Sequence, residues 1–510
     1  MITGEYTLNS KREKMNKKLN ININVIYYAV LILILITGTV YRTSVWINEP
    51  GFFGDEGALI HNIQTKTYLG LFTTLDKAQC CPSLFLFFNK FIYSIFGLNE
   101  QALRFIPYFS GILSIIFAPL FCKKVFNSKF ITLIFTSLLI YNPNAVYYSQ
   151  EFKQYSSDIL LTMAAIYLFF AFKDKVKNIK SAITTGILSG ISVFFSYSVQ
   201  FVVFPMLMFF MAEFVKKKEN KTALFTFFPY FLILFVCFIT TVFGTFFNGI
   251  LEAWIDEPFL VKNLSDFIHL NSYLTLNIPF ESFTAILFLS GTVLLAVKNR
   301  LLLYILIMPV LLNIISGVVN LYPFATGRVT LYLIPVFTVI ILFPFDYLLS
   351  KIKKTAKNEL VVIFTCILCF FFFQSQKPDY INGYKYYYIR SNAREYVKLL
   401  NKRNIDKNDI IFADTNAEGI FEIYDTEKKY INNRILYMKF HEPLKVIEYS
   451  EGIYHIDKIK KGEKIYFYNT ELYPDAVDVT VLRDWIQKNC KVLYKEKDSI
   501  GEFLYVKKIK

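Results

Sequence analysis

The sequence has few charged residues: Asp, Glu, Lys and Arg make up 19% of its 510 residues, whereas hydrophobic residues make up 54%. Its mean hydropathy is +0.39. This composition excludes a soluble globular protein and indicates a polytopic α-helical membrane protein. The net charge of +15 would suit a nucleic-acid-binding protein, but the Lys and Arg residues fall in short clusters between apolar runs, as they do in cytoplasmic loops. We therefore expect the lipid bilayer as a partner, and no nucleic acid.

Several other features are absent. No metal-ligand spacing joins the 7 cysteines, most of which lie in or beside apolar runs, where they behave as small hydrophobic residues. The first twenty residues are polar and basic, and the apolar run that follows is long and lacks a small-residue cleavage site. This pattern predicts an uncleaved first membrane helix rather than a signal peptide. The chain also has no internal repeat with a clear period.

Apolar runs of the length that spans a bilayer, roughly 17 to 25 residues, predict eleven crossings. They lie near 24–46, 103–121, 130–148, 156–172, 181–197, 199–215, 223–247, 280–297, 301–320, 329–349 and 359–375. A twelfth run, 82–98, is short and carries Lys90 at its centre. We expect it to lie at the outer face, because one more crossing would move the following basic clusters outside, against the positive-inside rule. The N-terminus is then cytoplasmic.

The stretch from Gly51 to Gly57 places Asp55 and Glu56 side by side just after the first predicted crossing. Two adjacent carboxylates repel each other and are costly near lipid, so this pair predicts a functional site. The alternative is a solvated acidic loop. The surrounding segment, about 47–102, is long for a connection and too apolar to be disordered, so we expect juxtamembrane helices there.

Two further polar features fall on the same, outer side. The first contains Glu151, Lys153, Tyr155 and Asp158 ahead of a predicted crossing, where a helix would place Glu151 and Tyr155 on one face. Its alternative explanation is an ordinary helix start with Ser156 or Ser157 as cap. The second is a tight turn that ends at Arg328, whose guanidinium suits phosphate oxygens. Snorkelling to the interface would also explain this arginine.

Residues 376–510 differ in composition from the rest and are numerous enough for one small domain. A helical stretch near 391–403 is followed by strand-like runs and by a second helical stretch near 479–489. The strand-like runs are 409–413, 434–438, 464–469, 491–495 and 501–506. This alternation predicts an extracytoplasmic α/β domain that covers or positions the membrane site, next to a catalytic membrane domain at 1–375. It has no Gly-rich phosphate loop, nucleophile elbow or zinc spacing.

Five short motifs resemble, in order, those of the GT-C integral membrane glycosyltransferases of the protein-mannosyltransferase and aminoarabinose-transferase superfamily, similar to glycosyltransferase family 39. They are Asp55-Glu56, Pro82-Ser83-Leu84, Asn99 to Phe105, Tyr148 to Tyr155, and Tyr322-Pro323 with Arg328. The chain departs from the family where Cys81-Pro82-Ser83 replaces His-Pro-Pro and where Lys153 replaces an arginine. The resemblance implies a GT-C fold of about 11 crossings with juxtamembrane helices.

The resemblance also implies a function: inverting transfer of a hexosyl or pentosyl group from a polyprenyl-phosphate-linked donor to a cell-envelope acceptor, outside the cytoplasmic membrane. Asp55 would be the general base, with Glu56 tuning it or binding the acceptor. Lys153 and Arg328 would neutralise the leaving lipid phosphate. Glu151, Tyr155 and Asp158 would bind the substrate, and a divalent cation near these carboxylates is left open. The sequence does not identify the sugar or the acceptor.

Two other classes share parts of the pattern. A membrane transporter or lipid flippase would need charges within the crossings and broken helices near the bilayer midplane, whereas the polar residues here gather at one face. An envelope glycan polymerase or ligase would use a similar lipid-linked donor, but would not be expected to carry an acidic pair directly after its first helix. A single glycosyltransferase site requires Asp55 and Glu151 to lie close together.

Overall fold

The structure is a computed structural model that describes most of the membrane part and about half of the C-terminal part. The described residues are 23–47, 51–52, 54–77, 79–245, 260–275, 281–352, 356–375, 393–403, 405, 409–414, 421–424, 434–438, 448–449, 452–453, 459–470, 485–497 and 501–510. The loop 248–272, which contains the acids Glu252, Asp256, Glu257 and Asp266, lies partly outside these residues.

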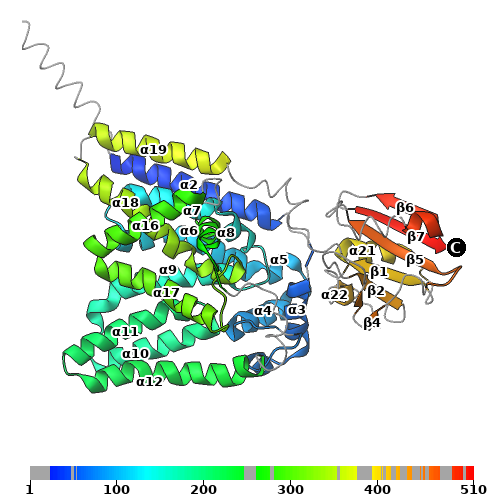
Figure 1. Cartoon of the computed structure of the whole chain (residues 1–510), viewed down its shortest axis with the longest axis horizontal. Helices are drawn as coiled ribbons and strands as arrows, with labels where there is room; N and C mark the ends of the chain where they lie inside the picture. Colours follow the sequence, from blue (N-terminus) through cyan, green and yellow to red (C-terminus); the bar gives the residue numbers. More distant parts are fainter. Residues whose placement is uncertain are drawn as a thin grey trace, which may run out of the picture.

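A bundle of long helices forms the larger part of the molecule (Figure 1). Each predicted crossing overlaps one helix of the bundle, although α7 and α10 have only 13 residues each. The helices are α2 (Ile23–Ile47), α6 (Phe105–Val125), α7 (Lys129–Tyr141), α9 (Tyr155–Phe172), α10 (Ile179–Ile191), α11 (Gln200–Lys216), α12 (Asn220–Cys237), α16 (Glu281–Lys298), α17 (Arg300–Val318), α18 (Ile334–Lys351) and α19 (Ala356–Ser375). Among the described residues, 8 helices are long and apolar enough to cross a membrane. The chain is therefore a multi-pass membrane protein, and the count of eleven crossings stays a prediction.

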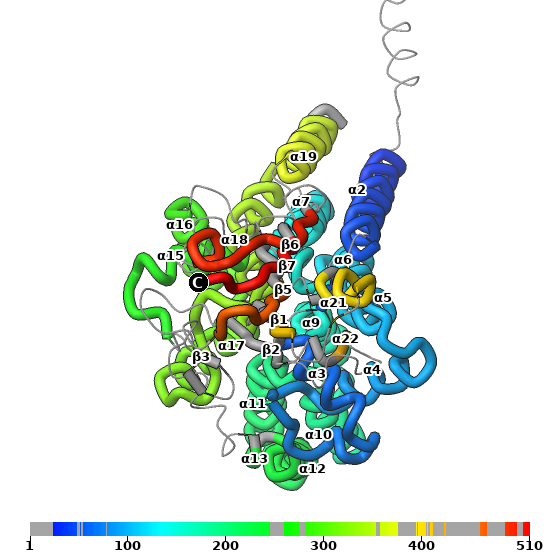
Figure 2. The backbone as a smooth tube through the Cα atoms, turned by 90° about the vertical axis from the view of Figure 1, so that its right-hand side faces the viewer, coloured from blue at the N-terminus to red at the C-terminus, as the bar shows by residue number. Residues whose placement is uncertain are grey.

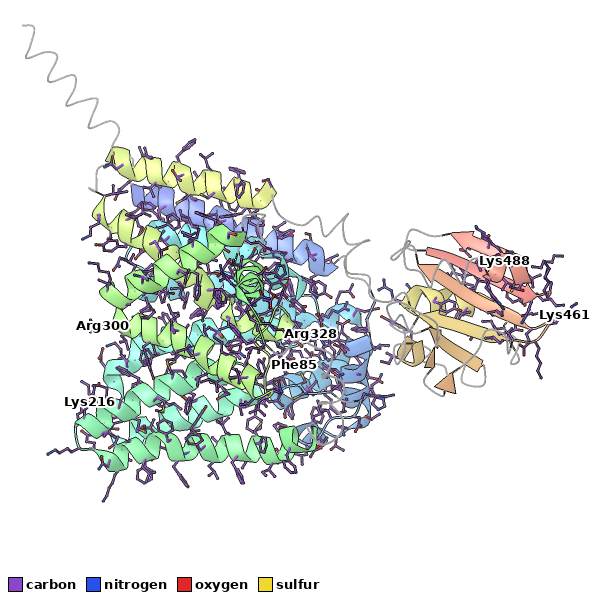
Figure 3. The ribbon with its side chains drawn as sticks, viewed as in Figure 1. Phe85, Lys216, Arg300, Arg328, Lys461 and Lys488 are labelled. Carbon is purple, nitrogen blue, oxygen red and sulfur yellow. The ribbon has the colours of Figure 1, made fainter. Side chains whose placement is uncertain are left out.

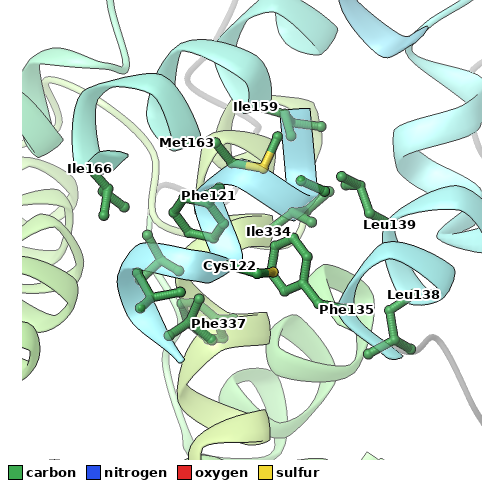
Figure 4. Close-up of a cluster of buried hydrophobic side chains, with 14 of the residues drawn as sticks. Phe121, Cys122, Phe135, Leu138, Leu139, Ile159, Met163, Ile166, Ile334 and Phe337 are labelled. Atoms are coloured by element: carbon green, nitrogen blue, oxygen red, sulfur yellow. The ribbon is translucent and has the colours of Figure 1, made fainter. Parts of the chain in front are cut away.

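The helices differ in how much of their surface is covered. On α12, large apolar side chains such as Leu224, Phe228 and Phe235 are exposed, as expected of a surface that faces lipid. The span that contains α18 is 83% buried, so this helix lies at the centre of the bundle. Figure 4 shows one core cluster, in which Phe121, Phe135, Met163 and Phe337 bring together α6, α7, α9 and α18. This core fixes α9 and α18, which follow two of the predicted site segments.

Four shorter helices lie between α2 and α6: α3 (Gly54–Thr65), η1 (Leu69–Phe72), α4 (Ser83–Phe96) and α5 (Glu100–Leu103). At 1.5 Å per residue the 14 residues of α4 extend about 21 Å, less than the hydrocarbon thickness. Figure 1 shows α3, α4 and α5 at the end of the bundle that faces the C-terminal domain. The segment therefore contains short helices, as expected, and their juxtamembrane position stays a prediction.

Three labelled cationic residues mark the two ends of the bundle. Figure 3 places Lys216 and Arg300, which belong to two of the predicted cytoplasmic clusters, at the end of the bundle far from the C-terminal domain. Arg328 lies toward the opposite end, near α4. These two basic residues and Arg328 thus lie toward different ends of the bundle.

The C-terminal domain is built around a five-stranded mixed sheet of order β2-β1-β5-β7-β6. Its strands are β1 (Ile410–Asp414), β2 (Arg434–Met438), β5 (Lys464–Thr470), β6 (Cys490–Lys497) and β7 (Gly501–Lys508), with β3 (Glu448–Tyr449) and β4 (Gly452–Ile453) forming a separate pair. β1 pairs in parallel with β2 and β5, and β7 pairs antiparallel with β5 and β6. The α/β prediction is confirmed; the helix expected near 479–489 lies partly outside the described residues.

Two short helices of this domain lie on its side toward the bundle: α21 (Ala393–Asn401) and α22 (Phe421–Tyr424). Figure 2, viewed from the side of the domain, shows them over the ends of α3 and α5. The proposed boundary between residues 375 and 376 follows the last residue of α19.

We expect the contact between α16 and α18 to depend on Gly291. A Cβ atom at this position would collide with the carbonyl oxygen of Ile340 on α18, so only glycine permits the close approach. Gly291→Ala should force the helices apart and lower the free energy of unfolding by roughly 1–3 kcal/mol. Thermal unfolding in detergent measures the loss.

The control is Ser290→Ala, at the exposed neighbouring position, which should unfold like the wild type. Equal midpoints for the two variants would contradict the packing of α16 on α18.

Candidate active site

Asp55 stands in the first turn of α3, at the bundle end that faces the C-terminal domain. A carboxylate in this position is favoured by the positive end of the helix dipole. Its Oδ2 lies 2.5 Å from Nη2 of Arg328, and its side chain is 32% exposed. Asp55 is therefore an accessible carboxylate held by a guanidinium.

Arg328 joins two acids that are far apart in the chain. It is the first residue of η6 (Arg328–Leu333), which leads directly into α18. Its Nη1 lies 3.6 Å from Oε1 of Glu151, and its guanidinium carbon lies 5.9 Å from the ring centroid of Tyr155. Four predicted site residues, Asp55, Glu151, Tyr155 and Arg328, thus meet in one place, as a single site requires.

Glu151 reaches Arg328 from a turn, because α8 (Pro143–Tyr147) ends before it and α9 begins only at Tyr155. The helical alignment of Glu151 with Tyr155 is therefore wrong. The backbone N–H of Lys153 donates to the carbonyl of Glu151 at 2.6 Å, closing a tight turn instead. The Glu151 side chain is 2% exposed, so its charge depends on protein partners rather than water.

Lys153 is buried at 4% exposure, and its Nζ donates to Oε1 of Gln79 at 2.8 Å. No carboxylate of the described residues forms an ion pair with it. Burying an ammonium group beside a neutral amide is costly without a nearby negative charge. A bound anion would supply that charge, two residues from Glu151.

Asp158 lies on α9, one turn beyond Tyr155, and is 2% exposed. Its carboxylate faces the hydroxyl groups of Ser196 and Ser198. Its Oδ1 has no hydrogen-bond partner among the described residues. It forms no ion pair with Arg328. The structure therefore places Asp158 deeper along α9 than the residues that Arg328 brings together.

Glu56 is next to Asp55 in sequence but has different surroundings, because consecutive helix residues point in different directions. It is fully buried. Arg104, between α5 and α6, donates from Nε to its Oε1 at 2.7 Å and from Nη2 to its Oε2. The backbone N–H of Phe152 donates to Oε1 at 2.6 Å. Glu56 thus connects α3 to α6 and to the turn that carries Glu151 and Lys153.

Three residues to which the sequence assigned no role support this geometry: Gln79, Arg104 and Arg42. Arg42 on α2 is 1% exposed and donates to the carbonyls of Ala145 and Leu139 at 2.7 and 2.8 Å. These bonds attach α2 to the segment just before Glu151. Arg42 interrupts an apolar run, and such a residue signals a specific partner.

The described residues offer no group of three His, Cys, Asp or Glu side chains that could hold a metal ion. At the site itself, Glu151 and Asp55 face a guanidinium rather than further carboxylates or imidazoles. The mechanism proposed below is built on these side chains alone.

The fold is that of GT-C membrane glycosyltransferases. The structure of ArnT from Cupriavidus metallidurans bound to undecaprenyl phosphate aligns with a TM-score of 0.52 at 9% identity, over 94% of this chain and 97% of that chain. The apo structure of the same protein gives a TM-score of 0.49 at 10% identity over the same shares of both chains. The Archaeoglobus fulgidus oligosaccharyltransferase AglB gives 0.43 at 14% identity, over 79% of this chain and 64% of that chain. The predicted fold class is confirmed.

Sequence comparison adds a family match. Residues 81–243 match the family model of dolichyl-phosphate-mannose-protein mannosyltransferases. A search of curated proteins gave no match. The matched segment contains Glu151, Lys153, Tyr155 and Asp158, and agrees with the resemblance seen in the motifs. Asp55 and Arg328 lie outside this segment, but their ion pairs connect them to Glu151 within it.

The buried pair of Glu56 and Arg104 allows a test of the site's support. Arg104→Met would leave the carboxylate of Glu56 buried without its cation, which should cost about 3–5 kcal/mol of stability. Removing both charges with Glu56→Gln and Arg104→Met should restore part of that loss. Thermal unfolding in detergent measures the three free energies.

Lys66→Met is the matched control, because it breaks the more exposed pair with Asp76, 3.0 Å apart, and should cost about 1 kcal/mol or less. If Arg104→Met were no worse than this control, the structural role of Glu56 would be refuted.

Proposed function

We propose that this protein transfers a sugar from a polyprenyl-phosphate-linked donor to a cell-envelope acceptor on the outer side of the membrane. The observation that carries the proposal is the buried ammonium of Lys153, without an acidic partner among the described residues, beside the bridge of Asp55, Arg328 and Glu151. The GT-C fold and the match to dolichyl-phosphate-mannose-dependent enzymes support it.

The two cations suit the phosphate of a lipid carrier. As the sugar leaves, negative charge develops on that phosphate, and fixed positive charges in a site of low dielectric constant stabilise it. Lys153 would act as a point charge, and Arg328 would bind two oxygens through its planar guanidinium. The ArnT structure with undecaprenyl phosphate supports a ligand of this class.

Asp55 is the best candidate for the general base. In an inverting displacement, the acceptor oxygen forms a bond to the anomeric carbon while the bond from that carbon to the phosphate oxygen breaks. The acceptor proton passes to the Asp55 carboxylate, and the electron pair of the broken bond stays with the lipid phosphate. Of the two adjacent acids, Asp55 is the exposed one.

The roles of the other predicted residues follow from their contacts. Glu151 orients Arg328, and Tyr155 lines the same place beneath the guanidinium. Oδ1 of Asp158 accepts no hydrogen bond from the described residues and would bind a sugar hydroxyl deeper along α9. Glu56 has a positioning role in this proposal rather than the catalytic or acceptor-binding role inferred from sequence, because its oxygens are bonded to Arg104 and Phe152.

Binding of the donor would also release the base. Arg328 holds the carboxylate of Asp55, and a carboxylate next to a guanidinium accepts a proton less readily than a free one. A phosphate competes for the same guanidinium through two-point contacts. The donor would therefore bind first and free Asp55 for the acceptor.

The proposed orientation has a cytoplasmic N-terminus and an extracytoplasmic C-terminal domain in the cytoplasmic membrane. It is supported by the labelled basic residues at the far end of the bundle (Figure 3). A transporter or flippase fits less well, since the site gathers at one end rather than at the midplane. A glycan polymerase or ligase would bind a similar carrier, and only the product distinguishes it.

The test of function compares envelope glycans by mass spectrometry in a strain with the gene deleted and in the same strain carrying the wild type or Asp55→Asn. The wild type should restore a sugar that the deletion removes. Asp55→Asn should reduce transfer by about 10²–10⁴-fold, because the base is lost, while purified protein still binds undecaprenyl phosphate.

Asp76→Asn, which changes another acid of the same outer segment, should transfer sugar normally. Full transfer by Asp55→Asn would disprove the role of the base, and glycans unchanged by the deletion would disprove the function.

Lys153→Met should weaken the binding of undecaprenyl phosphate, which Asp55→Asn should leave intact. It retains the length and the apolar stem of lysine but removes the ammonium, so undecaprenyl phosphate should bind at least about tenfold more weakly. Native mass spectrometry of purified protein with undecaprenyl phosphate measures the change. Lys90→Met is the control, since its Nζ donates to the carbonyl of Ile63 outside the site. Unchanged affinity in Lys153→Met would refute the phosphate site.

A further inference from the structure

We propose that the C-terminal domain is a fixed part of the catalytic unit, in which Tyr424 and Arg394 position the segment that leads to Asp55. The inference rests on the proposed function, because it assigns positioning residues for the same base. The domain would be required for the rate of transfer, and not for binding the lipid phosphate.

The first contact is made by Tyr424, the last residue of α22. Its hydroxyl accepts a hydrogen bond from the backbone N–H of Phe52 at 2.8 Å. The same hydroxyl donates to Oε1 of Glu100 on α5 at 2.9 Å. The phenol group of Tyr424 therefore joins the segment before α3 to α5. Its contact in the first of these, Phe52, lies three residues before Asp55.

The second contact is an ion pair across the same boundary. Nη1 of Arg394, near the start of α21, lies 3.2 Å from Oε1 of Glu100. The Glu100 side chain is largely buried. Burial alone would raise the pKa of Glu100, but hydrogen bonds from its own backbone, from Tyr424 and from Arg394 lower this pKa overall. Glu100 is thus kept charged as the common acceptor of both domain residues.

Apolar packing accompanies these bonds. Phe52 is fully buried and stacks on Tyr424, with ring centroids 6.2 Å apart at an angle of 27°. The guanidinium carbon of Arg104, which also holds Glu56, lies 4.9 Å from the centroid of the Phe52 ring. Phe52 is therefore held between the domain on one side and the buried ion pair on the other.

Gly51 shows how closely the domain approaches. A Cβ atom at this position would lie 3.0 Å from the hydroxyl oxygen of Tyr424 and 3.2 Å from the Cβ of Arg394. Arg104 Nη2 donates to the Gly51 carbonyl at 3.4 Å. The backbone before α3 is thus bounded by domain side chains and by Arg104, which together set where α3 begins. The position of Asp55 against Arg328 follows from that start.

The sequence of α5 explains how this short helix contacts both the domain and Glu56. Asn99 caps the helix, accepting a hydrogen bond from the N–H of Ala102 at 2.8 Å. Glu100 and Arg104 follow four residues apart, so they lie one turn from each other. Glu100 binds the C-terminal domain and Arg104 binds Glu56, so α5 connects the position of the domain to the position of Asp55 and Glu56.

The experiment starts from Tyr424→Phe in the full-length protein, which removes one hydroxyl and keeps the ring. Sugar transfer should fall about three- to tenfold, since two hydrogen bonds are lost. Affinity for undecaprenyl phosphate should be unchanged, because Lys153 and Arg328 are untouched. The matched control is Tyr494→Phe, which loses a single bond from its hydroxyl to Glu496 at 2.9 Å within the domain and should transfer normally.

A disulfide provides the rescue. Gly51→Cys with Arg394→Cys, added to Tyr424→Phe, would place two Cβ atoms close to the usual disulfide separation of about 3.5–4.5 Å. The oxidised protein should form this bond, detected by peptide mass spectrometry, and should recover transfer to within about twofold of the wild type. Reduction should abolish the recovery. Each single cysteine variant controls for the native cysteines, which are all free.

The outcomes separate the two proposals. Failure of the disulfide to form, normal transfer by Tyr424→Phe, or weakened undecaprenyl phosphate binding in that variant would each overturn the positioning role. None of these results would affect the proposed function. If the wild type itself transfers no sugar, the proposed function fails, whereas the disulfide still reports whether the domain docks as described.

Discussion

The bonds to Glu56 are the constraint on which the site depends. Its carboxylate is held by Arg104 and by the backbone of Phe152, so one buried group fixes α3, the start of α6 and the turn of Glu151 and Lys153. In a medium of low dielectric constant, each oxygen must keep its donor, because an unpaired buried charge is strongly unfavourable. The neighbouring Asp55 faces Arg328 instead. Of the two adjacent acids, Glu56 therefore supports the site and Asp55 is the reactive group in the proposal.

Much of the fold could be predicted from the sequence, because bilayer thickness imposes one length on every crossing and apolar composition reveals it. The five strands of the mixed sheet were predicted within a few residues from short apolar or aromatic runs between polar segments, whereas the two-residue strands β3 and β4 were not predicted. Hydropathy alone did not decide whether α4 crosses the bilayer, so its juxtamembrane position was predicted from the distribution of Lys and Arg, a property of the whole chain.

The site could be predicted only in part. The motifs identified Asp55, Glu151 and Arg328, whose types and places suit the chemistry, and the structure brings them together. The opposite surroundings of Asp55 and Glu56 could not be predicted, because they depend on where α3 begins. Tyr424 has no sequence signal at all: its partner Phe52 lies 372 residues away, and a single tyrosine in a short helix is unremarkable.

The contacts of Glu56 with Arg104 and the contacts of the C-terminal domain with the segment before α3 have a common physical consequence for catalysis. Carboxylates and cations that must exchange partners during a reaction need fixed surroundings, since preorganised charges cost no rearrangement when the transition state forms. Arg328 can move from Asp55 to a phosphate only if Glu151 still holds it and α3 does not follow. Arg104 and the C-terminal domain restrain α3 from two sides. When Arg328 exchanges Asp55 for a phosphate, one ion pair therefore changes while α3 and the turn of Glu151 keep their positions.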